Sequence, residues 1–545
     1  MGGALGCVTV DQATVGLQVQ FGKAKKVVAP GVHFVQMRDS LVAALTSIAC
    51  GGGKDMDLTQ DMKHALVIPL AAQAHVAGMY RFALQLARRG VTITFVTMAE
   101  DVPKMKAYEE LQGLDFRLIS YSPLLITASS VENFSGLEKF IIDAGVHFKP
   151  ILEELKARKK SGVPGPTCVV YDRFCTWVGD VAEELKLPLY TFFSCGAILA
   201  RYLKEVPRLF SEEGPLKIKQ DGTLQNFEGI VNVSGLPPLT FADLPGSTRL
   251  RPQNSLNIAK TMEKAELVIV NTFYELEYPQ IDAMEQWHAD QARTSGRKKT
   301  ELFLVGPLSS AASFQDVSFT RLGPKAEKTD TKAGEFLQWL NGQPPQSVLF
   351  ICMGSLYHWN PLQVYELALA LESSGQRFLW VLPLGDHISS LEAVLPAGFE
   401  ERMRGMGLVA SGWVPQLQIL SHGAVGGFLT HCGWNSLIES ISSGVPVICW
   451  PEKAEQFMNR RYFVDVLKIG VNVGPGELGS TFVPHENFEK AFRLLMVEDE
   501  GKAIRSKVQK LMLSARAAVT AGGASCRALD EISTRIPGNY TNVPA

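Results

Sequence analysis

Apolar runs of strand length alternate along most of the chain with helix-length segments in which apolar and polar positions repeat. From His64 onward the runs are ALVIPL, VTITFVT, TCVVYD, LPLYTFF and LVIVNT, and a second series continues with SVLFICMGS, QRFLWVLP, GLVASGW, VGGFLTH and VPVICWP. Continuous apolar strands separated by helices are typical of parallel sheets that are covered on both faces. The pattern therefore predicts an α/β fold built from two successive halves.

Two stretches interrupt this rhythm. Residues 1–62 differ from the rest and end in the loop-like CGGGKDMDLTQDMK, and the polar stretch at 309–334 separates the two series of strands. We interpret the first as an N-terminal extension with a linker and the second as an interdomain connection.

Composition excludes several classes of function. Lys+Arg 53 and Asp+Glu 55 give a net charge of −2, so no global charge favours binding to nucleic acid. The nine cysteines are scattered without a CxxC pair, which predicts reduced thiols in a cytoplasmic protein and no structural zinc site. We find no candidate transmembrane helix or cleavable signal.

Polar residues follow two apolar runs of the second half, where parallel strands end and ligands bind. The first end carries Gly354 and Ser355, and the second carries the sequence HCGWNS at 431–436. Backbone N–H groups at a helix N-terminus, together with hydroxyl, amide and imidazole donors, predict a phosphate site. Ser436 and Glu439 also match a capping box, in which both residues only satisfy helix N-terminal amides.

The segment from Trp413 to Gln456 decides between these interpretations. It closely resembles the signature box of plant family 1 UDP-sugar glycosyltransferases, from the opening Trp-x-Pro-Gln through His-Cys-Gly-Trp-Asn-Ser to the closing Trp-Pro and acid-Gln. The resemblance implies that Trp413, Val414 and Gln416 hold uracil and that Glu439 accepts the ribose hydroxyls. It further implies a site for the diphosphate and the sugar formed by Ser355, His431, Gly433, Trp434, Asn435, Ser436, Glu455, Gln456 and Ser194.

Two departures from the family pattern concern the sugar pocket. Position 455 carries Glu where Asp is common, and EKA at 452–454 replaces a stretch that is usually apolar. Gln456 and Trp434 together favour UDP-glucose over galactose or glucuronic acid donors.

The first half supplies a candidate base. His75 follows the first strand just ahead of a helix, and Asp172 ends a later strand. The resemblance implies that His75 deprotonates the acceptor and that Asp172 orients it, although Ala74 and Gly78 replace the family's glycine and proline. A histidine is suited to this task near neutral pH. Asp180, on the following helix, is interpreted as a solvated surface residue.

The resemblance spans about residues 63–537 and implies a GT-B architecture, with two Rossmann-like domains facing across a cleft. We expect the N-terminal extension and linker at 1–62, the acceptor-binding domain at 63–308, the interdomain linker at 309–334, the UDP-sugar-binding domain at 335–520, and a C-terminal segment at 521–545 that crosses back to the first domain.

The implied activity is inverting transfer of a sugar, preferentially glucose, from a UDP-sugar to a hydroxyl of a flavonoid, another phenol or a terpenoid alcohol. The UDP-sugar is a co-substrate, and neither a further cofactor nor a metal is expected. A monomer is the default expectation for this chain.

The first 34 residues resemble the N-terminus of plant hypersensitive-induced reaction proteins, which are membrane scaffolds. Gly2 and Cys7 are candidate acylation sites for peripheral membrane attachment, although position 6 is Gly and not Ser or Thr. A gene-model fusion or a disordered appendage is the alternative.

Other functions remain as alternatives. A nicotinamide-dependent oxidoreductase needs a GxGxxG motif, which PLAAQAHVAG at 69–78 lacks. A catalytically inactive UDP-sugar-binding protein is opposed by His75 and Asp172. A membrane-associated scaffold would rest on the N-terminal extension alone.

Overall fold

The computed structural model describes most of the chain after residue 62. The described residues are 17–21, 24–28, 62–99, 101–102, 105, 113–121, 152–153, 155–157, 165–296, 300–308, 329–354, 357, 359–383, 390–412, 414–474 and 482–538. Within the N-terminal extension, β1 (Leu17–Phe21) and β2 (Ala24–Val28) form an antiparallel pair. Gly2 and Cys7, the candidate acylation sites, lie outside the described residues.

The first domain is built on a parallel sheet of seven strands in the order β5-β4-β3-β6-β7-β8-β9. Its central strands are apolar and buried on both faces, as the sequence pattern predicted. The strands are β3 (His64–Ile68), β4 (Thr92–Met98), β5 (Phe116–Tyr121), β6 (Cys168–Asp172), β7 (Leu189–Phe193), β8 (Leu267–Val270) and β9 (Glu301–Leu304).

The second domain repeats this arrangement with six parallel strands in the order β12-β11-β10-β13-β14-β15. The strands are β10 (Val348–Cys352), β11 (Arg377–Val381), β12 (Gly407–Ala410), β13 (Val425–Thr430), β14 (Val447–Cys449) and β15 (Gly470–Asn472). In both sheets the order of strands reverses beside the first strand, between β3 and β6 and between β10 and β13. In doubly wound sheets, ligands bind in the crevice at this reversal.

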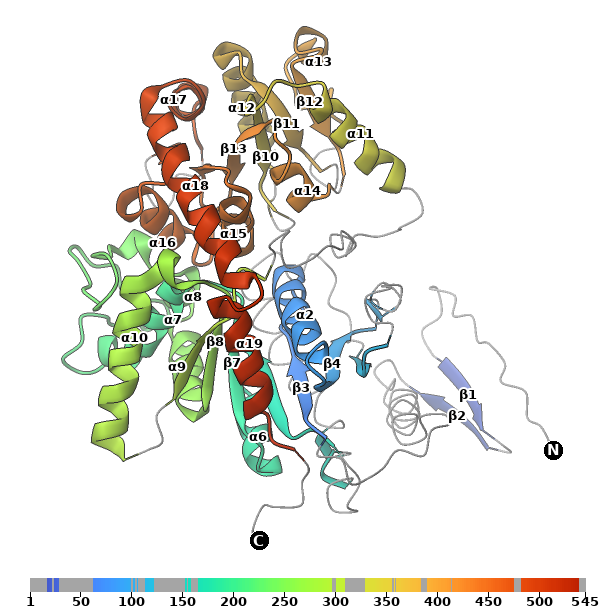
Figure 1. The fold of residues 1–545 in the computed structure, drawn as a ribbon, viewed down its shortest axis with the longest axis vertical. Coiled ribbons are helices and arrows are strands. Elements are labelled where there is room, and N and C mark those ends of the chain that lie inside the picture. The colour runs from blue at the N-terminus through green and yellow to red at the C-terminus, as the bar shows by residue number, and fades with distance from the viewer. Residues whose placement is uncertain are drawn as a thin grey trace.

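Helices cover both sheets (Figure 1). In the first domain they are α2 (Gln73–Ala87), α6 (Val178–Leu185), α7 (Ala197–Leu209), α8 (Gly246–Leu250), α9 (Pro252–Lys264) and α10 (Tyr274–Ser295), with the short helix η2 (Phe241–Asp243). In the second they are α11 (Thr329–Asn341), α12 (Pro361–Ser374), α13 (Phe399–Arg402), α14 (Gln416–Leu420), α15 (Trp434–Ser443), α16 (Gln456–Arg461), α17 (His485–Met496) and α18 (Asp499–Val519), with the π-helix η4 (Tyr462–Val466).

The last helix, α19 (Ala524–Arg535), lies against the first domain after α18 has packed on the second (Figure 1). Polar contacts join α19 to the first domain. Arg89 donates to Asp530 at 2.7 Å, and Arg535 pairs with Glu301 at 2.9 Å. Helix α11 begins at Thr329, inside the range expected for the interdomain linker, and residues 309–328 lie outside the description.

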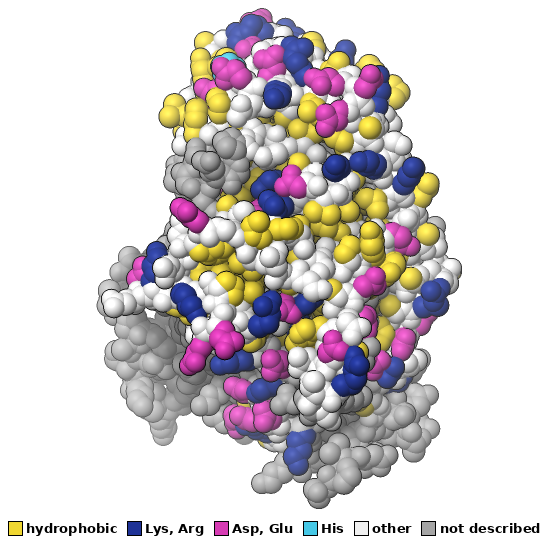
Figure 2. Space-filling view, turned by 90° about the vertical axis from the view of Figure 1, so that its left-hand side faces the viewer, with side chains coloured by type: hydrophobic (Ala, Val, Ile, Leu, Met, Phe, Trp, Pro, Cys, Tyr) yellow, Lys and Arg dark blue, Asp and Glu magenta, His cyan; other side chains and the backbone are white. Residues whose placement is uncertain are grey.

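The described part of the chain contains no helix with the length and apolarity needed to cross a membrane. Its seven cysteines, at 168, 175, 195, 352, 432, 449 and 526, are all free thiols. On the face shown in Figure 2, Lys and Arg side chains are interspersed with Asp and Glu side chains and with apolar ones. The described part of this face therefore offers no extended basic surface for a polyanion.

The centre of the second domain provides a test of core packing. Phe350 of β10 stacks on Phe428 of β13 with ring centroids 5.0 Å apart, and both rings are fully buried. Because Phe350→Ala leaves a cavity beside the strand reversal, we expect it to lower the free energy of unfolding by about 3–5 kcal/mol. Leu513→Ala, at a side chain that is 61% exposed, is the control. Equal midpoints of the two variants in denaturant unfolding followed by tryptophan fluorescence would contradict this view of the core.

Candidate active site

Three polar residues meet at the carboxyl ends of the central strands of the first sheet. His75 lies in the first turn of α2, directly inside the helix that it was expected to precede. Its Nδ1 atom is 2.6 Å from Asp172 Oδ2, at the end of β6, and 3.0 Å from Ser194 Oγ, which follows β7. Asp172 is fully buried, whereas 17% of the His75 side chain is exposed. The imidazole is thus anchored on one side and accessible on the other.

The electrostatics of Asp172 define the tautomer of this histidine. Burial alone would raise the pKa of Asp172, but the charge and hydrogen bond of His75, the charge of Arg173 and the Phe174 N–H together hold it below its ordinary value. Asp172 is therefore a carboxylate at neutral pH and can only accept a hydrogen bond. We assign the proton to Nδ1 of His75, which leaves Nε2 as a proton acceptor.

Arg173 is a residue of this cluster that the sequence analysis missed. Its side chain is 2% exposed, and the guanidinium carbon lies 4.4 Å from the centroid of the Phe174 ring. A buried cation beside Asp172 favours the charged form of that carboxylate. The available signal was a charged residue placed directly after an apolar strand.

In the second domain, His431 follows β13 and is enclosed by two glycines. A Cβ atom on Gly354 would lie 2.8 Å from His431 Cε1, and one on Gly433 would lie 2.4 Å from His431 Nε2. Gly354 also has a φ of +79°, a conformation that disfavours other residues. Both glycines are therefore required for the imidazole to lie beside the N-terminus of α15.

Helix α15 begins at Trp434, and among the described residues no side chain caps it. The capping-box interpretation of Ser436 and Glu439 is therefore wrong. Gln416 Nε2 instead donates to Ser436 Oγ at 3.2 Å and to Glu439 Oε2 at 2.8 Å. The N–H groups of the first turn point to the strand ends without a side-chain cap, which is the geometry of an anion site.

Glu439 also receives a contact from the other domain. Arg81 Nη1, on the same helix as His75, lies 3.4 Å from Glu439 Oε1, and both side chains are about nine-tenths buried. Arg81 had no predicted role, because nothing along the chain links it to a carboxylate so distant in sequence.

Two hydrogen bonds join the first turn of α15 to the first domain. Trp434 Nε1 donates to the carbonyl oxygen of Asn271 at 2.8 Å, and Asn435 Nδ2 donates to that of Ala74 at 2.9 Å. Ala74 directly precedes His75. The candidate base therefore faces the N-terminus of α15, as the sequence predicted for the two strand ends.

The structure describes three of the remaining predicted residues, Val414, Glu455 and Gln456. Val414 is buried beside Gln416, and Glu455 directly precedes α16. Gln456 Oε1 accepts the backbone N–H groups of Glu452 and Lys453 at 2.9 and 2.8 Å. Ser355 and Trp413 lie outside the described residues. Within the described part of the chain, no group of His, Cys, Asp or Glu is arranged to hold a metal ion.

Comparison with known proteins identifies the family. A family model described as UDP-glucoronosyl and UDP-glucosyl transferase matches residues 316–486. UDP-glycosyltransferase 73E1 of Stevia rebaudiana is 33% identical over 496 residues, which cover 85% of this chain and 94% of the relative. This chain belongs to the UDP-glycosyltransferase family.

Further relatives of this UDP-glycosyltransferase agree. An anthocyanidin 5,3-O-glucosyltransferase of a Rosa hybrid cultivar is 31% identical, covering 81% of this chain and 89% of its own. A UDP-glucosyltransferase from Polygonum tinctorium capable of glucosylating indoxyl, solved in complex with 3,4-dichloroaniline, has a similar structure, with a TM-score of 0.72 and 29% identity, covering 87% of this chain and 99% of the other. The GT-B architecture is therefore confirmed. The resemblance of residues 1–34 to membrane scaffolds stays a prediction.

The protonation of His431 generates a prediction about this UDP-glycosyltransferase. Burial, with a smaller effect from the charge of Lys453, lowers the pKa of His431 to about 4. The unfolded chain, with a histidine pKa of about 6.5, then binds a proton that the folded chain does not. Folding stability is expected to fall as the pH decreases from about 6.5 to 4. Denaturant unfolding at several pH values measures this slope, which His431→Gln should reduce; an unchanged slope would contradict the assignment.

Proposed function

We propose that this UDP-glycosyltransferase transfers glucose from UDP-glucose to a hydroxyl group of a small plant-type metabolite, such as a flavonoid, another phenol or a terpenoid alcohol. The observation that carries the proposal is the His75–Asp172 pair, placed opposite the N-terminus of α15 by the Asn435 contact. The names of the rose and Polygonum relatives support glucose as the sugar.

The donor is assigned to the crevice at the strand reversal of the second sheet. Its diphosphate would lie at the N-terminus of α15, where helix N–H groups and the side chains of His431 and Asn435 offer hydrogen bonds. Gln416 and Glu439, already joined by a hydrogen bond, would hold the uracil edge and the ribose hydroxyls. The other assignments remain those implied by the resemblance: Trp413 and Val414 for uracil, Ser355, Gly433 and Ser436 for the diphosphate, and Trp434, Glu455, Gln456 and Ser194 for the sugar.

The chemical step follows from the position of His75. Its Nε2 atom removes the proton of the acceptor hydroxyl while the oxygen attacks the anomeric carbon from the side opposite UDP, which inverts that carbon. Asp172 stabilises the imidazolium that forms. Negative charge develops on the leaving diphosphate, and one well-placed hydrogen bond to it contributes about 3 kcal/mol to the transition state.

A catalytically inactive sugar-nucleotide binder is the competing candidate. It would have no use for a fully buried carboxylate 2.6 Å from a histidine whose other face is accessible. The geometry of the pair therefore favours an enzyme.

The proposal is tested by incubating the purified protein with UDP-glucose and a panel of phenols, flavonoids and terpenoid alcohols. We expect at least one acceptor to gain a hexose, detected by mass spectrometry. Tight binding of UDP-glucose in calorimetry, without a product from any acceptor, would favour the inactive binder.

Substitutions of the two histidines are expected to have different effects. His75→Ala removes the base, so kcat should fall by a factor of about 100 to 10,000 while UDP affinity is retained. His431→Ala removes a candidate phosphate ligand and should mainly weaken UDP binding. Asp180→Asn, at a surface side chain that is 80% exposed, is the matched control. Calorimetry and initial rates measure both effects, and lost UDP affinity with intact turnover in His75→Ala would contradict the assigned roles.

A further inference from the structure

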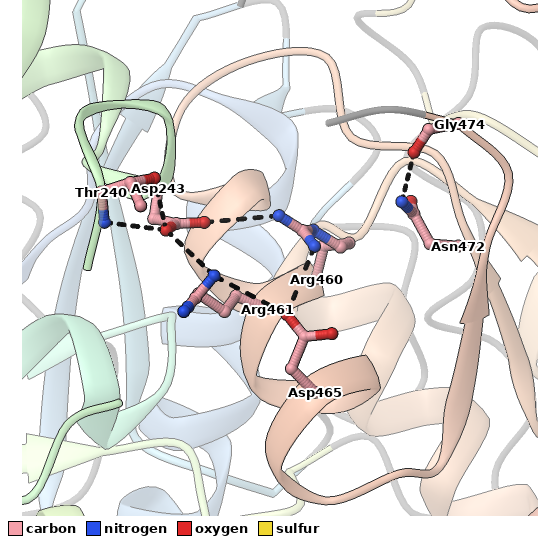
Figure 3. Close-up of polar contacts among 7 residues, drawn as sticks. All are labelled: Thr240, Asp243, Arg460, Arg461, Asp465, Asn472 and Gly474. Carbon is pink, nitrogen blue, oxygen red and sulfur yellow. Dashed lines mark hydrogen bonds and ion pairs between the residues drawn. The ribbon is translucent and has the colours of Figure 1, made fainter. Parts of the chain in front are cut away.

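A buried carboxylate of the first domain forms ion pairs with two arginines of the second. Asp243, at the end of η2, is 1% exposed; Arg460 Nη2 lies 3.3 Å from its Oδ1 atom, and Arg461 Nη1 lies 3.5 Å from its Oδ2 atom. Figure 3 shows both guanidinium groups directed at this carboxylate from the end of α16. None of the roles assigned above uses these residues.

Asp243 is also held by hydrogen bonds within its own domain. The backbone N–H and the hydroxyl of Thr240 both donate to Asp243 Oδ2, at 2.9 and 2.8 Å. These two hydrogen bonds fix the position of the Asp243 carboxylate that the arginines of the second domain contact. Ion pairs at this depth are screened less than surface pairs, so the cluster fixes the position of the end of α16 relative to η2.

The arginines lie one helical turn after the segment expected to hold the donor sugar. Helix α16 starts at Gln456, whose Oε1 atom accepts two N–H groups of the preceding turn and thereby closes the segment 452–456 on itself. A displacement of Arg460 and Arg461 would therefore move Gln456 and the turn it closes as one body.

The same region of the first domain touches this segment directly. Gly246 N donates to the carbonyl oxygen of Ala454 at 2.8 Å, and a Cβ atom on Gly246 would lie 3.3 Å from Ala454 N. The guanidinium carbon of Arg249 lies 5.4 Å from the centroid of the Phe457 ring. Residues 240–249 thus contact the segment 452–461 directly. These contacts are separate from those that α15 makes with the first domain.

The arginines also have a carboxylate in their own domain. Asp465 Oδ2 lies 3.4 Å from Arg460 Nη1 and 3.8 Å from Arg461 Nη1, and its side chain is 45% exposed (Figure 3). Among the described residues, Asp243 is the first-domain residue that forms ion pairs with these arginines. Asp243 and Asp465 therefore pair with the same two arginines, Asp243 across the domain interface and Asp465 within the second domain. Asp465 can serve as the control for Asp243.

We propose that Asp243 is a positioning residue for the donor sugar: through Arg460 and Arg461 it holds the segment 452–456 in the place where the sugar binds. The inference rests on the proposed function, because it takes that segment as the sugar subsite. Among the described residues, the ion pairs of Asp243 with Arg460 and Arg461 involve no group assigned to uracil, ribose or diphosphate. Helix α16 reaches the diphosphate region separately, through Asn459, whose Nδ2 atom donates to the carbonyl oxygen of Cys432 at 3.0 Å. Asp243 should therefore matter more for UDP-glucose than for UDP.

The test compares the affinities of UDP-glucose and UDP by calorimetry in Asp243→Asn and Asp465→Asn. Since charge-assisted hydrogen bonds are worth a tenfold change or more, we expect the Kd of UDP-glucose to rise about tenfold in Asp243→Asn while the Kd of UDP stays within about twofold. Asp465→Asn should leave both values unchanged. In initial rates the KM for UDP-glucose should rise by a similar factor.

A second variant covers the case in which Asp243→Asn does not fold. Arg461→Gln removes the ion pairs with Asp243 and Asp465 at a side chain that is 26% exposed, and it should raise the ratio of the two Kd values in the same direction. Thermal unfolding monitors the integrity of each variant. Equal weakening of UDP and UDP-glucose, or no change in either, would overturn the inference. A wild-type protein that binds neither nucleotide would instead overturn the proposed function.

Discussion

The hydrogen bond from Asn435 to the carbonyl oxygen of Ala74 places the two halves of the site opposite each other. Asn435 belongs to the first turn of the helix that offers its N–H groups to an anion, and Ala74 is the residue before the candidate base. A base and a donor site in different domains are useful only at a defined separation, because transfer needs the reacting atoms nearly in contact. The hydrogen bond from the neighbouring Trp434 to the carbonyl oxygen of Asn271 is a second link that fixes the distance between the two domains.

Charged residues at the domain interface also restrict how the two domains meet. Arg81 faces Glu439, and Asp243 faces Arg460 and Arg461, so each pair takes one partner from each domain. Burying these charges costs desolvation free energy that offsets much of their attraction, so the pairs specify how the two domains meet and contribute little net stability. The same pairs connect helix α2, which carries His75, with Glu439 and connect the end of α16 with the first domain.

Much of the fold was predictable from local patterns. Apolar runs with helical segments between them predicted two parallel sheets, and the polar residues expected at the carboxyl ends of strands lie there. His75 and Asp172 were expected to meet, and they lie 2.6 Å apart. The capping box at Ser436 and Glu439 failed because α15 begins at Trp434 with Gly433 as its N-cap, so that Ser436 already lies inside the first turn. Arg81 and Asp243 were missed because a charged residue reveals nothing along the chain about a distant partner that it meets after folding.

The sequence by itself determined which chemical groups this protein has and on which strand end or helix each one is placed, because hydrophobic periodicity and the signature box are properties of neighbouring residues. The tertiary structure alone decided which of those groups face one another. Asn435 and Ala74 are 361 residues apart in the chain, and Arg460 and Asp243 are 217 apart. Contacts at such separations depend on how the two sheets pack as whole bodies, and no short stretch of sequence contains that information.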